Sequence, residues 1–270
     1  MSALTSPPIV ALLRGYVTSF VNRQDFSAMP HYLAENYTLY TGGLEICGRD
    51  GPYRDAVARQ FNQFPGLVYT LHEIYPTSDA VAVRFTEHGS SNRHAGRCAG
   101  WSSIAIYRAR GGLLVTCAIE QDYFSRRRQL DTGESIAVDS PAIAPWDAPV
   151  AAANAGAEKT VRGWLADRVF TESREVHIDD SQVTGHVDPI IDPSGAEVLD
   201  ILSSGPHVAF HAVQKGRLTG DFLRTSPSLR RSEVYIHLSG LVTVREGSVI
   251  RGNIIRDRFG LYRRLASAPH

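Results

Sequence analysis

The hydrophobic positions of residues 1–130 change from a helical to a strand-like spacing along the chain. Between residues 8 and 23 they recur every three to four positions, which predicts an amphipathic helix. A short helix is expected at about 27–35, and another in the segment GRDGPYRDAVARQF, with Asp50 as its N-cap. Strands are then predicted at 67–75, 80–90, 99–109 and 113–124. This order indicates an α+β fold, in which a curved antiparallel sheet wraps over N-terminal helices to form a cone with an apolar interior.

Two segments of the chain end in a similar way. IEQDYFSRRRQL at 119–130 and IIRDRFGLYRRL at 254–265 share their spacing of Ile, Asp, Phe, Arg and Leu, so that Asp122 matches Asp257. The earlier segments LLRGYVTSFV and TVRGWLADRV also match, each with Arg-Gly before an aromatic residue. Recurrence of both a beginning and an end predicts two copies of one fold.

We therefore expect two cone-shaped domains, at 1–130 and 155–270, joined by a Pro- and Ala-rich linker at 131–154 and arranged as a pseudo-dimer. The second domain should be shallower, because fewer residues separate its matching Gly and Asp. In it, a helix is predicted at 157–170 and strands at 207–214, 233–244 and 248–259. Ser194 and Glu197 have the spacing of a capping box, which predicts a helix start and gives Glu197 a structural role.

The composition of the chain argues against nucleic acid and membranes as binding partners. Lys and Arg together number 28, as do Asp and Glu, so no net charge favours nucleic acid or an anionic membrane. No stretch approaches the roughly 20 apolar residues of a membrane span, and the N-terminus MSALTSPPIV lacks the charged start of a signal peptide. The three cysteines are odd in number and far apart, which indicates reduced thiols, a cytoplasmic location and no cysteine metal site.

The order of elements, with GRD after a short strand predicted at YTLYTGG (37–43) and DYF in the last strand, resembles the nuclear transport factor 2-like superfamily. More narrowly it is similar to the SnoaL-like polyketide cyclases and the limonene epoxide hydrolases. In such epoxide hydrolases the aspartate of the closing strand is an acid/base residue, which the resemblance places at Asp122. Their tyrosine on the first strand corresponds to Tyr37. Their second aspartate has Glu87 as its nearest counterpart, although here Arg84 lies three residues before it rather than two.

Residue chemistry adds a carboxylate pair. Glu120 and Asp122 are two apart on a predicted strand, so they should share one face. If that face lines the cone, repulsion in a dry site would raise one pKa toward neutrality and suit it to proton transfer. Glu87, at the end of an apolar strand face, could be tuned in the same way. The alternative is that Glu120 and Asp122 pair with arginines such as Arg126 at the sheet edge.

Aromatic residues and one histidine are the candidates for substrate binding. A flat or ring-shaped ligand would be held by apolar faces with a few polar groups, and each residue could equally belong to an ordinary core. The candidates are Tyr16, Tyr40, His72, Trp101 and Tyr107. The segment HIDDSQVTGHVD at 177–188 gathers histidines and acids, but its spacing matches no metal-ligand pattern, so we expect no metal there. Motifs for nucleotide, NAD and serine-hydrolase chemistry are absent, which predicts no cofactor.

These observations predict a cofactor-free acid/base enzyme whose N-terminal cone acts on a small hydrophobic metabolite. Cyclisation, isomerisation, dehydration and epoxide opening all fit. The alternative is a non-catalytic ligand-binding or scaffold protein of the same fold. A further homodimer is compatible with either reading. In the second copy Ile255 stands where the first has Glu120, and we expect a nearby arginine to lower the pKa of Asp257 and keep it structural.

Overall fold

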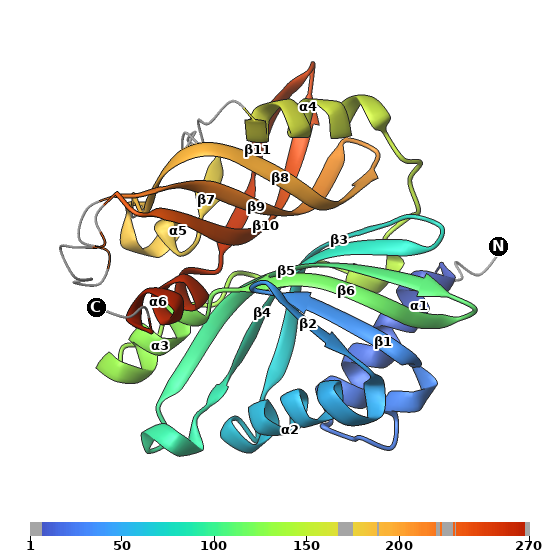
Figure 1. The fold of residues 1–270 in the computed structure, drawn as a ribbon. Coiled ribbons are helices and arrows are strands. Elements are labelled where there is room, and N and C mark those ends of the chain that lie inside the picture. The colour runs from blue at the N-terminus through green and yellow to red at the C-terminus, as the bar shows by residue number, and fades with distance from the viewer. Residues whose placement is uncertain are drawn as a thin grey trace.

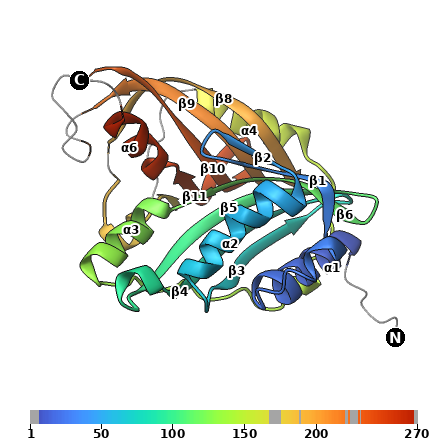
Figure 2. The ribbon, with the colours of Figure 1, turned by 60° about the horizontal axis from the view of Figure 1, so that its bottom comes forward.

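A computed structural model describes residues 7–166, 175–187, 189–219, 222, 229 and 231–267. Two β-sheets face each other at the centre of the described molecule, and helices cover their outer faces (Figure 1). Helices α3 and α6, which follow the last strand of each sheet, lie side by side at one end (Figures 1 and 2). The fold is α+β with two cone-shaped units, as the pattern of residues predicts. Within the described ranges, every helix is too short or too polar to span a bilayer.

The N-terminal unit is a six-stranded sheet with helices across one face. Its strands are ordered β2-β1-β6-β5-β4-β3, and all neighbours are antiparallel except β1 and β6, which run parallel. The sheet is therefore mixed rather than purely antiparallel. The elements are α1 (Pro8–Gly15), η1 (Tyr16–Val21), η2 (Met29–His31), β1 (Leu33–Thr41), β2 (Leu44–Cys47), η3 (Arg49–Tyr53), α2 (Arg54–Gln63), β3 (Val68–Pro76), β4 (Ala80–Ser90), η4 (Asn92–His94), β5 (Cys98–Arg110), β6 (Leu113–Gln121) and α3 (Tyr123–Thr132).

The C-terminal unit has a five-stranded sheet and fewer elements. Its sheet is ordered β7-β11-β10-β9-β8, and again only the pair of first and last strands, β7 and β11, runs parallel. Among the described residues nothing corresponds to β2, and the single turn α5 stands where the first unit has α2. The elements are η5 (Pro145–Asp147) in the connection, then α4 (Ala155–Ala166), β7 (Val176–Ile178), α5 (Ser181–Thr184), β8 (Ile191–Ser204), β9 (His207–Leu218), β10 (Glu233–Arg245), β11 (Ser248–Arg256) and α6 (Arg258–Ala266).

Three local predictions are wrong. The helix expected at 27–35 is only the turn η2, because Leu33 begins a strand that pairs with β6 and buries Leu33 completely. Asp50 does not cap a helix, since its carboxylate instead binds the Arg49 guanidinium at 2.6 Å. Glu197 lies in β8, where strand pairing with β9 overrides the capping-box spacing, and its exposed carboxylate is 3.3 Å from Lys215. The helix expected at 157–170 is described only as far as Ala166.

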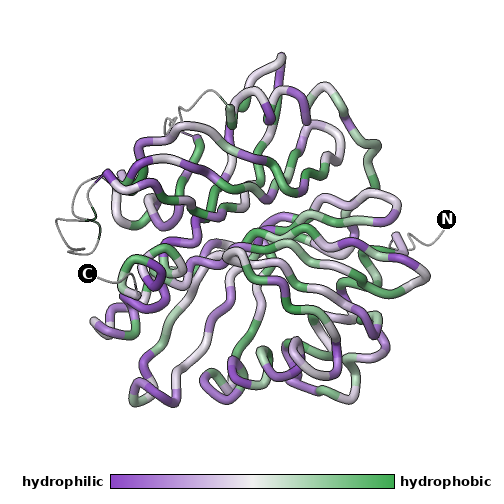
Figure 3. Tube along the Cα trace, viewed as in Figure 1, coloured by the Kyte–Doolittle hydropathy of each residue, from purple (hydrophilic) through white to green (hydrophobic). Residues whose placement is uncertain are grey.

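Apolar residues form one core inside each cone and another where the sheets meet. Strand β4 shows how one strand serves two cores, because Val81 and Val83 point into the N-terminal cone while Ala80 and Ala82 point toward the second sheet. The small alanines allow the sheets to approach closely. Figure 3 shows hydrophobic stretches along the strands where the sheets face each other. The residues of this contact are Ala80, Ala82, Ile104, Ile106, Leu202, Ala209, Leu241 and Ile255.

Candidate active site in the N-terminal cone

A single buried carboxylate lies inside the N-terminal cone. Glu87, on β4, has no exposed surface. Its Oε1 accepts hydrogen bonds from Gln121 Nε2 on β6 and from Ser103 Oγ on β5, the latter at 3.2 Å. Its Oε2 accepts a hydrogen bond from Gln60 Nε2 on α2. The sheet and the helix that crosses it therefore supply three donors to one carboxyl group.

The position of Glu87 follows from the alternation of β4. Val81, Val83 and Phe85 belong to the core of the cone, and Glu87 comes next on the same face. Burial there raises its pKa to about 7, while the hydrogen bond from Gln121 and the charge of Arg126 act in the opposite direction. A carboxyl group with this pKa can both accept and donate a proton near neutral pH.

A cation and an indole lie beside this carboxyl group. The Arg126 guanidinium lies 4.1 Å from the Tyr123 ring centroid and 5.0 Å from that of Trp101, and burial lowers its pKa. Trp101 is fully buried, and its Nε1 has no hydrogen-bond partner. Buried donors without partners are uncommon in proteins and often mark a place where a ligand or water molecule binds. Here the free N–H adds one donor to the polar groups of the cone.

Tyrosines line the rest of the interior. The hydroxyl groups of Tyr16 and Tyr53 are 2.6 Å apart, and the Tyr37 ring packs edge-on against Tyr53 at 4.8 Å between centroids. Tyr107 lies 5.8 Å from Tyr16. Burial raises the pKa of all four phenols well above the usual value, so they stay neutral and keep a proton to donate.

The structure brings together five of the nine residues selected from the sequence, namely Tyr16, Tyr37, Glu87, Trp101 and Tyr107. Two others lie elsewhere in the same unit. Tyr40 is 37% exposed on β1. His72 lies on the outer face of the sheet, where its ring nitrogens are within hydrogen-bond distance of Ser140 O at 2.9 Å and Thr86 Oγ1 at 2.8 Å. Neither faces the interior, so the placement expected for them is wrong.

The expected carboxylate pair does not line the cone. In β6, Ile119 and Gln121 point inward, so Glu120 between them points toward the second sheet. Glu120 Oε1 accepts a hydrogen bond from the backbone N–H of Gly42 at 2.8 Å and lies 3.0 Å from His211 Nε2. The face was assigned wrongly because both faces of this strand are buried.

Asp122 also lies at the interface between the units. Its Oδ1 accepts a hydrogen bond from Ser125 N at 3.0 Å, which makes it the N-cap of α3. Its two carboxylate oxygens accept from Arg258 Nη2 at 2.8 and 2.7 Å. Of the two readings of this residue, the geometry matches pairing with an arginine, although Arg258 comes from the other end of the chain. The sequence did not predict the three side chains that donate hydrogen bonds to Glu87, namely Gln60, Ser103 and Gln121. Strand alternation was the only signal for Ser103 and Gln121.

The histidine- and acid-rich segment at 177–186 binds arginines. Asp179 lies 2.6 Å from Arg256, and Asp180 lies 2.6 Å from Arg128 and 3.0 Å from Arg258. These contacts join α3, β11 and the start of α6. Asp188, which belongs to the same sequence segment, lies outside the described residues.

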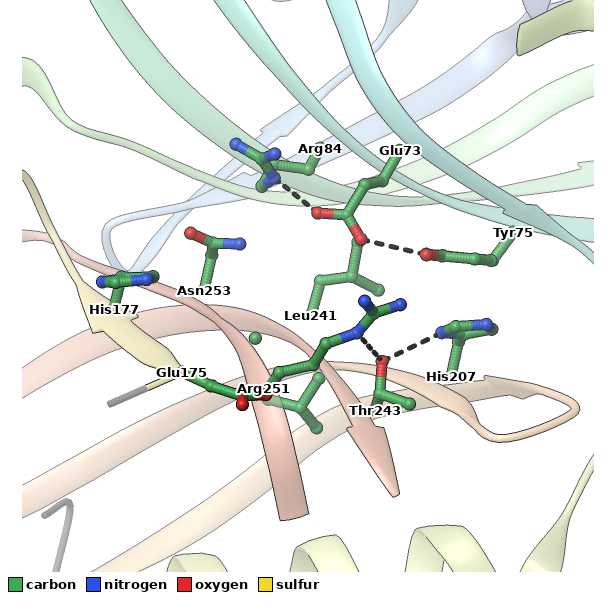
Figure 4. Close-up of a pocket in the computed structure, with 12 residues that line it drawn as sticks. Glu73, Tyr75, Arg84, Glu175, His177, His207, Leu241, Thr243, Arg251 and Asn253 are labelled. Atoms are coloured by element: carbon green, nitrogen blue, oxygen red, sulfur yellow. Dashed lines mark hydrogen bonds and ion pairs between the residues drawn. The ribbon is translucent and has the colours of Figure 1, made fainter. Parts of the chain in front are cut away.

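A hollow of about 300 Å³ opens between the two sheets (Figure 4). From the first sheet, Glu73 binds Arg84 Nε at 2.7 Å and accepts a hydrogen bond from the Tyr75 hydroxyl at 3.0 Å. From the second, Arg251 Nε donates to Thr243 Oγ1 at 3.3 Å, on the opposite wall of the hollow (Figure 4). The Glu73 carboxylate of this hollow is partly exposed and paired with an arginine, whereas Glu87 in the cone is fully buried and has no ion-pair partner within 4 Å among the described residues, so the cone is the stronger candidate for proton transfer.

One protein family matches part of the N-terminal unit. Residues 13–117 match the SnoaL-like domain family. No curated protein sequence matches the chain.

Similar solved structures each cover about half of the chain. TsrD from Streptomyces laurentii is 23% identical over 46% of this chain and 94% of its own, with a TM-score of 0.41. IdmH from Streptomyces antibioticus, provisionally assigned as a polyketide cyclase, is 20% identical over 46% and 98%, with a TM-score of 0.41. An LEH-like epoxide hydrolase from M. tuberculosis is 13% identical over 47% and 88%, with a TM-score of 0.40.

Proposed function

We propose that the N-terminal cone is the active site of a cofactor-free enzyme that moves a proton on a small hydrophobic metabolite. The observation that carries this proposal is Glu87, a fully buried carboxyl group with a pKa of about 7 among aromatic side chains. Polyketide cyclase, isomerase, dehydratase and epoxide hydrolase chemistry all require such a proton transfer. The SnoaL-like domain supports this range of reactions without selecting one of them.

In this proposal Glu87 takes a proton from the substrate and returns it at another atom. Gln60 and Gln121 donate hydrogen bonds to its carboxylate and so hold its orientation. The Tyr123 hydroxyl donates to Gln121 Oε1, which fixes the amide with its Nε2 toward Glu87. Gln121 and Tyr123 are therefore positioning residues. The Trp101 N–H is suited to donate a hydrogen bond to an oxygen of the substrate.

A chromogenic probe can test the base directly. In 5-nitrobenzisoxazole a base removes the carbon-bound proton, the N–O bond breaks, and a coloured cyanophenolate is released. We expect the full-length protein to accelerate this release, with a rate that rises as pH passes through about 7 and Glu87 loses its proton. Glu87→Gln should lower the rate by about two orders of magnitude, since an amide cannot accept the proton.

Two control variants separate the base from bulk carboxylates. Glu197→Gln removes an exposed carboxylate, and Asp122→Asn removes a buried one outside the cone. Both should keep the rate per folded molecule within a few-fold of the wild type. A Glu87→Gln rate equally close to the wild type would remove Glu87 from the mechanism and with it the proposed function.

The alternative, a ligand-binding or scaffold protein, is favoured by one observation. The hydroxyl groups of Tyr16 and Tyr53 pair with each other, and the side chains of the interior pack together as a core. A binding protein would take up an apolar fluorescent dye with equal affinity in the wild type and in Glu87→Gln, and it would show no turnover of the probe.

We also propose that residues 155–270 are a shortened copy of residues 1–130, joined through 131–154. The matching order of helices and strands, and the parallel pairing of the first strand with the last strand in each unit, support this relation. Because the second copy has only the turn α5 in place of α2, the helix that carries Gln60, we expect turnover in the first cone alone.

A further inference from the structure

Two histidines and a carboxylate converge between the two sheets. Glu120 comes from β6 of the first sheet, and His211 and His237 come from β9 and β10 of the second. One possible ligand atom from each of the three lies within 4.8 Å of the others, and all three residues are buried. Their sequence positions are far apart, so no spacing pattern could reveal them.

Two polar atoms in and beside this cluster lack hydrogen bonds. His237 Nδ1 is buried and has no partner, on a side chain that is 8% exposed. Asp257 Oδ2 is also buried without a hydrogen bond, and its nearest cation is Arg264 Nη1 at 3.6 Å. Native proteins rarely leave such atoms unsatisfied, and an ordered water molecule or a bound ion commonly supplies the missing partner.

The charges around the cluster favour a cation. Burial and the nearby Glu120 raise the pKa of Asp257 to about 6, opposite to the arginine-lowered pKa expected from the sequence. A divalent cation would stabilise both carboxylates, whereas Arg264 supplies only one positive charge.

The hairpin between β1 and β2 closes the cluster. A Cβ atom on Gly42 would lie 2.9 Å from Asp257 Oδ2, and one on Gly43 would lie 2.8 Å from His237 Nε2. Both glycines have positive φ, at 54° and 80°, which other residues rarely adopt. The Gly42 N–H also donates to Glu120 at 2.8 Å and so orients that carboxylate, as supporting groups do around metal ligands.

We propose that Glu120, His211 and His237 bind a divalent transition-metal ion between the two units, with Asp257 as the adjacent carboxylate. Two imidazoles with one carboxylate form a common ligand set for zinc, which makes Zn²⁺ the best match. In a tetrahedral zinc site the ligand atoms are roughly 3.3 Å apart, close to the 3.0 Å between Glu120 Oε1 and His211 Nε2. The ion would join the two units and is independent of the chemistry proposed for Glu87.

Metal binding to the full-length protein tests this proposal. After treatment with a chelator and its removal, we expect Zn²⁺ to bind with one equivalent of micromolar affinity or tighter by calorimetry, and to raise the melting temperature. Co²⁺ in the same site should give the visible absorption of a tetrahedral complex. His237→Gln and Glu120→Gln should each weaken Zn²⁺ binding at least tenfold and abolish the increase in melting temperature.

A histidine elsewhere in the same interface is the matched control. His207 stacks on Tyr75 at 3.8 Å between ring centroids and is not part of the cluster. His207→Gln should therefore bind Zn²⁺ as the wild type does. Glu120→Gln keeps an oxygen that can accept the hydrogen bond from the Gly42 N–H, so this variant should fold. Its loss of Zn²⁺ binding therefore tests the proposal even if His237→Gln fails to fold. Absence of saturable binding in the wild type, or unchanged binding in Glu120→Gln, would overturn the proposal.

Discussion

At the scale of single residues, the direction of a side chain decides its chemistry. Glu87, Glu120 and Asp122 are all buried acids near the end of a strand. Only Glu87 points into the cone, where amide and hydroxyl donors surround it. The other two contact His211 and Arg258 of the second unit. Burial alone therefore does not identify a candidate acid/base residue. A carboxylate that is paired with an arginine stays ionised, whereas one surrounded by neutral donors can gain and lose a proton.

The raised pKa of Glu87 predicts a characteristic dependence of stability on pH. Between its unfolded pKa of 4.5 and its folded pKa of about 7, the folded state holds a proton that the unfolded state has lost. The free energy of unfolding should thus decrease as pH rises through this window, by about 3 kcal/mol from this group alone. Glu87→Gln cannot titrate, so its stability should lack this decrease. Denaturant titrations at pH 5 and pH 8 measure the difference, and parallel pH profiles for both proteins would contradict the raised pKa.

Asp122→Asn should destabilise the protein. The substitution keeps an oxygen for the Ser125 N–H but removes the charge opposite the buried Arg258. Since Asp179 and Asp180 also contact Arg258, we expect a loss of about 1–3 kcal/mol in unfolding free energy rather than the full cost of an isolated buried charge. Asp131→Asn, in the exposed pair with Arg127, is the control and should cost under about 0.5 kcal/mol. Equal losses in the two variants would argue against a structural role for Asp122.

At the scale of elements, local alternation predicted the strands well. Predicted strand 80–90 coincides with β4, and 67–75, 99–109 and 113–124 overlap β3, β5 and β6. Predictions failed where pairing with a distant strand outweighed a local signal, as for Glu197 in β8 and for the segment that starts at Leu33. The capping-box spacing is a local preference of about 1 kcal/mol, whereas the long β8–β9 pairing buries and hydrogen-bonds many residues at once.

Close packing inside the second sheet predicts a sensitive glycine. A Cβ on Gly240 in β10 would lie 2.2 Å from the ring of Phe210, which is itself fully buried. We expect Gly240→Ala to cost about 1–3 kcal/mol in unfolding free energy, because the ring cannot move without disturbing the core. Gly195→Ala, in β8 of the same sheet, is the matched control, since its Cβ would meet nothing within 4 Å. Chemical denaturation compares the two, and a tolerated Gly240→Ala would mean that the ring shifts freely.

At the scale of the whole molecule, the interface between the sheets explains why the site was only partly predictable. Both faces of the N-terminal sheet are buried, one under its helices and one against the second sheet. Periodicity separates two faces, but it does not say which of them covers the cone when both are apolar. Glu87 was placed correctly because three large apolar residues precede it in phase. Glu120 was assigned to the wrong face of β6. Its neighbour on the same face is Ala118, and alanine is a small residue that occurs both in the cone and between the sheets.

The same interface predicts how a fragment would behave. A chain ending after α3 would expose the apolar face around Ala80, Ala82 and Ile104, together with Glu120 and Asp122. We expect such a fragment to form heterogeneous assemblies or to precipitate, since this patch would lack its cover. Analytical ultracentrifugation of residues 1–132 measures this. A stable monomer would show that the N-terminal unit does not depend on the second sheet.

The ion pair between Asp122 and Arg258 also affects which units can pack against each other. Arg258 follows Asp257, whereas the residue that follows Asp122 is Tyr123. Two N-terminal units in the same arrangement would have no arginine at that position, so the Asp122 carboxylate would lack the counter-ion that Arg258 supplies. Identical halves thus incur a penalty that unlike halves avoid, which is how proteins discriminate between competing partners. Arg258, whose counterpart in the first unit is Tyr123, therefore favours contact between the two unlike units over contact between two identical ones.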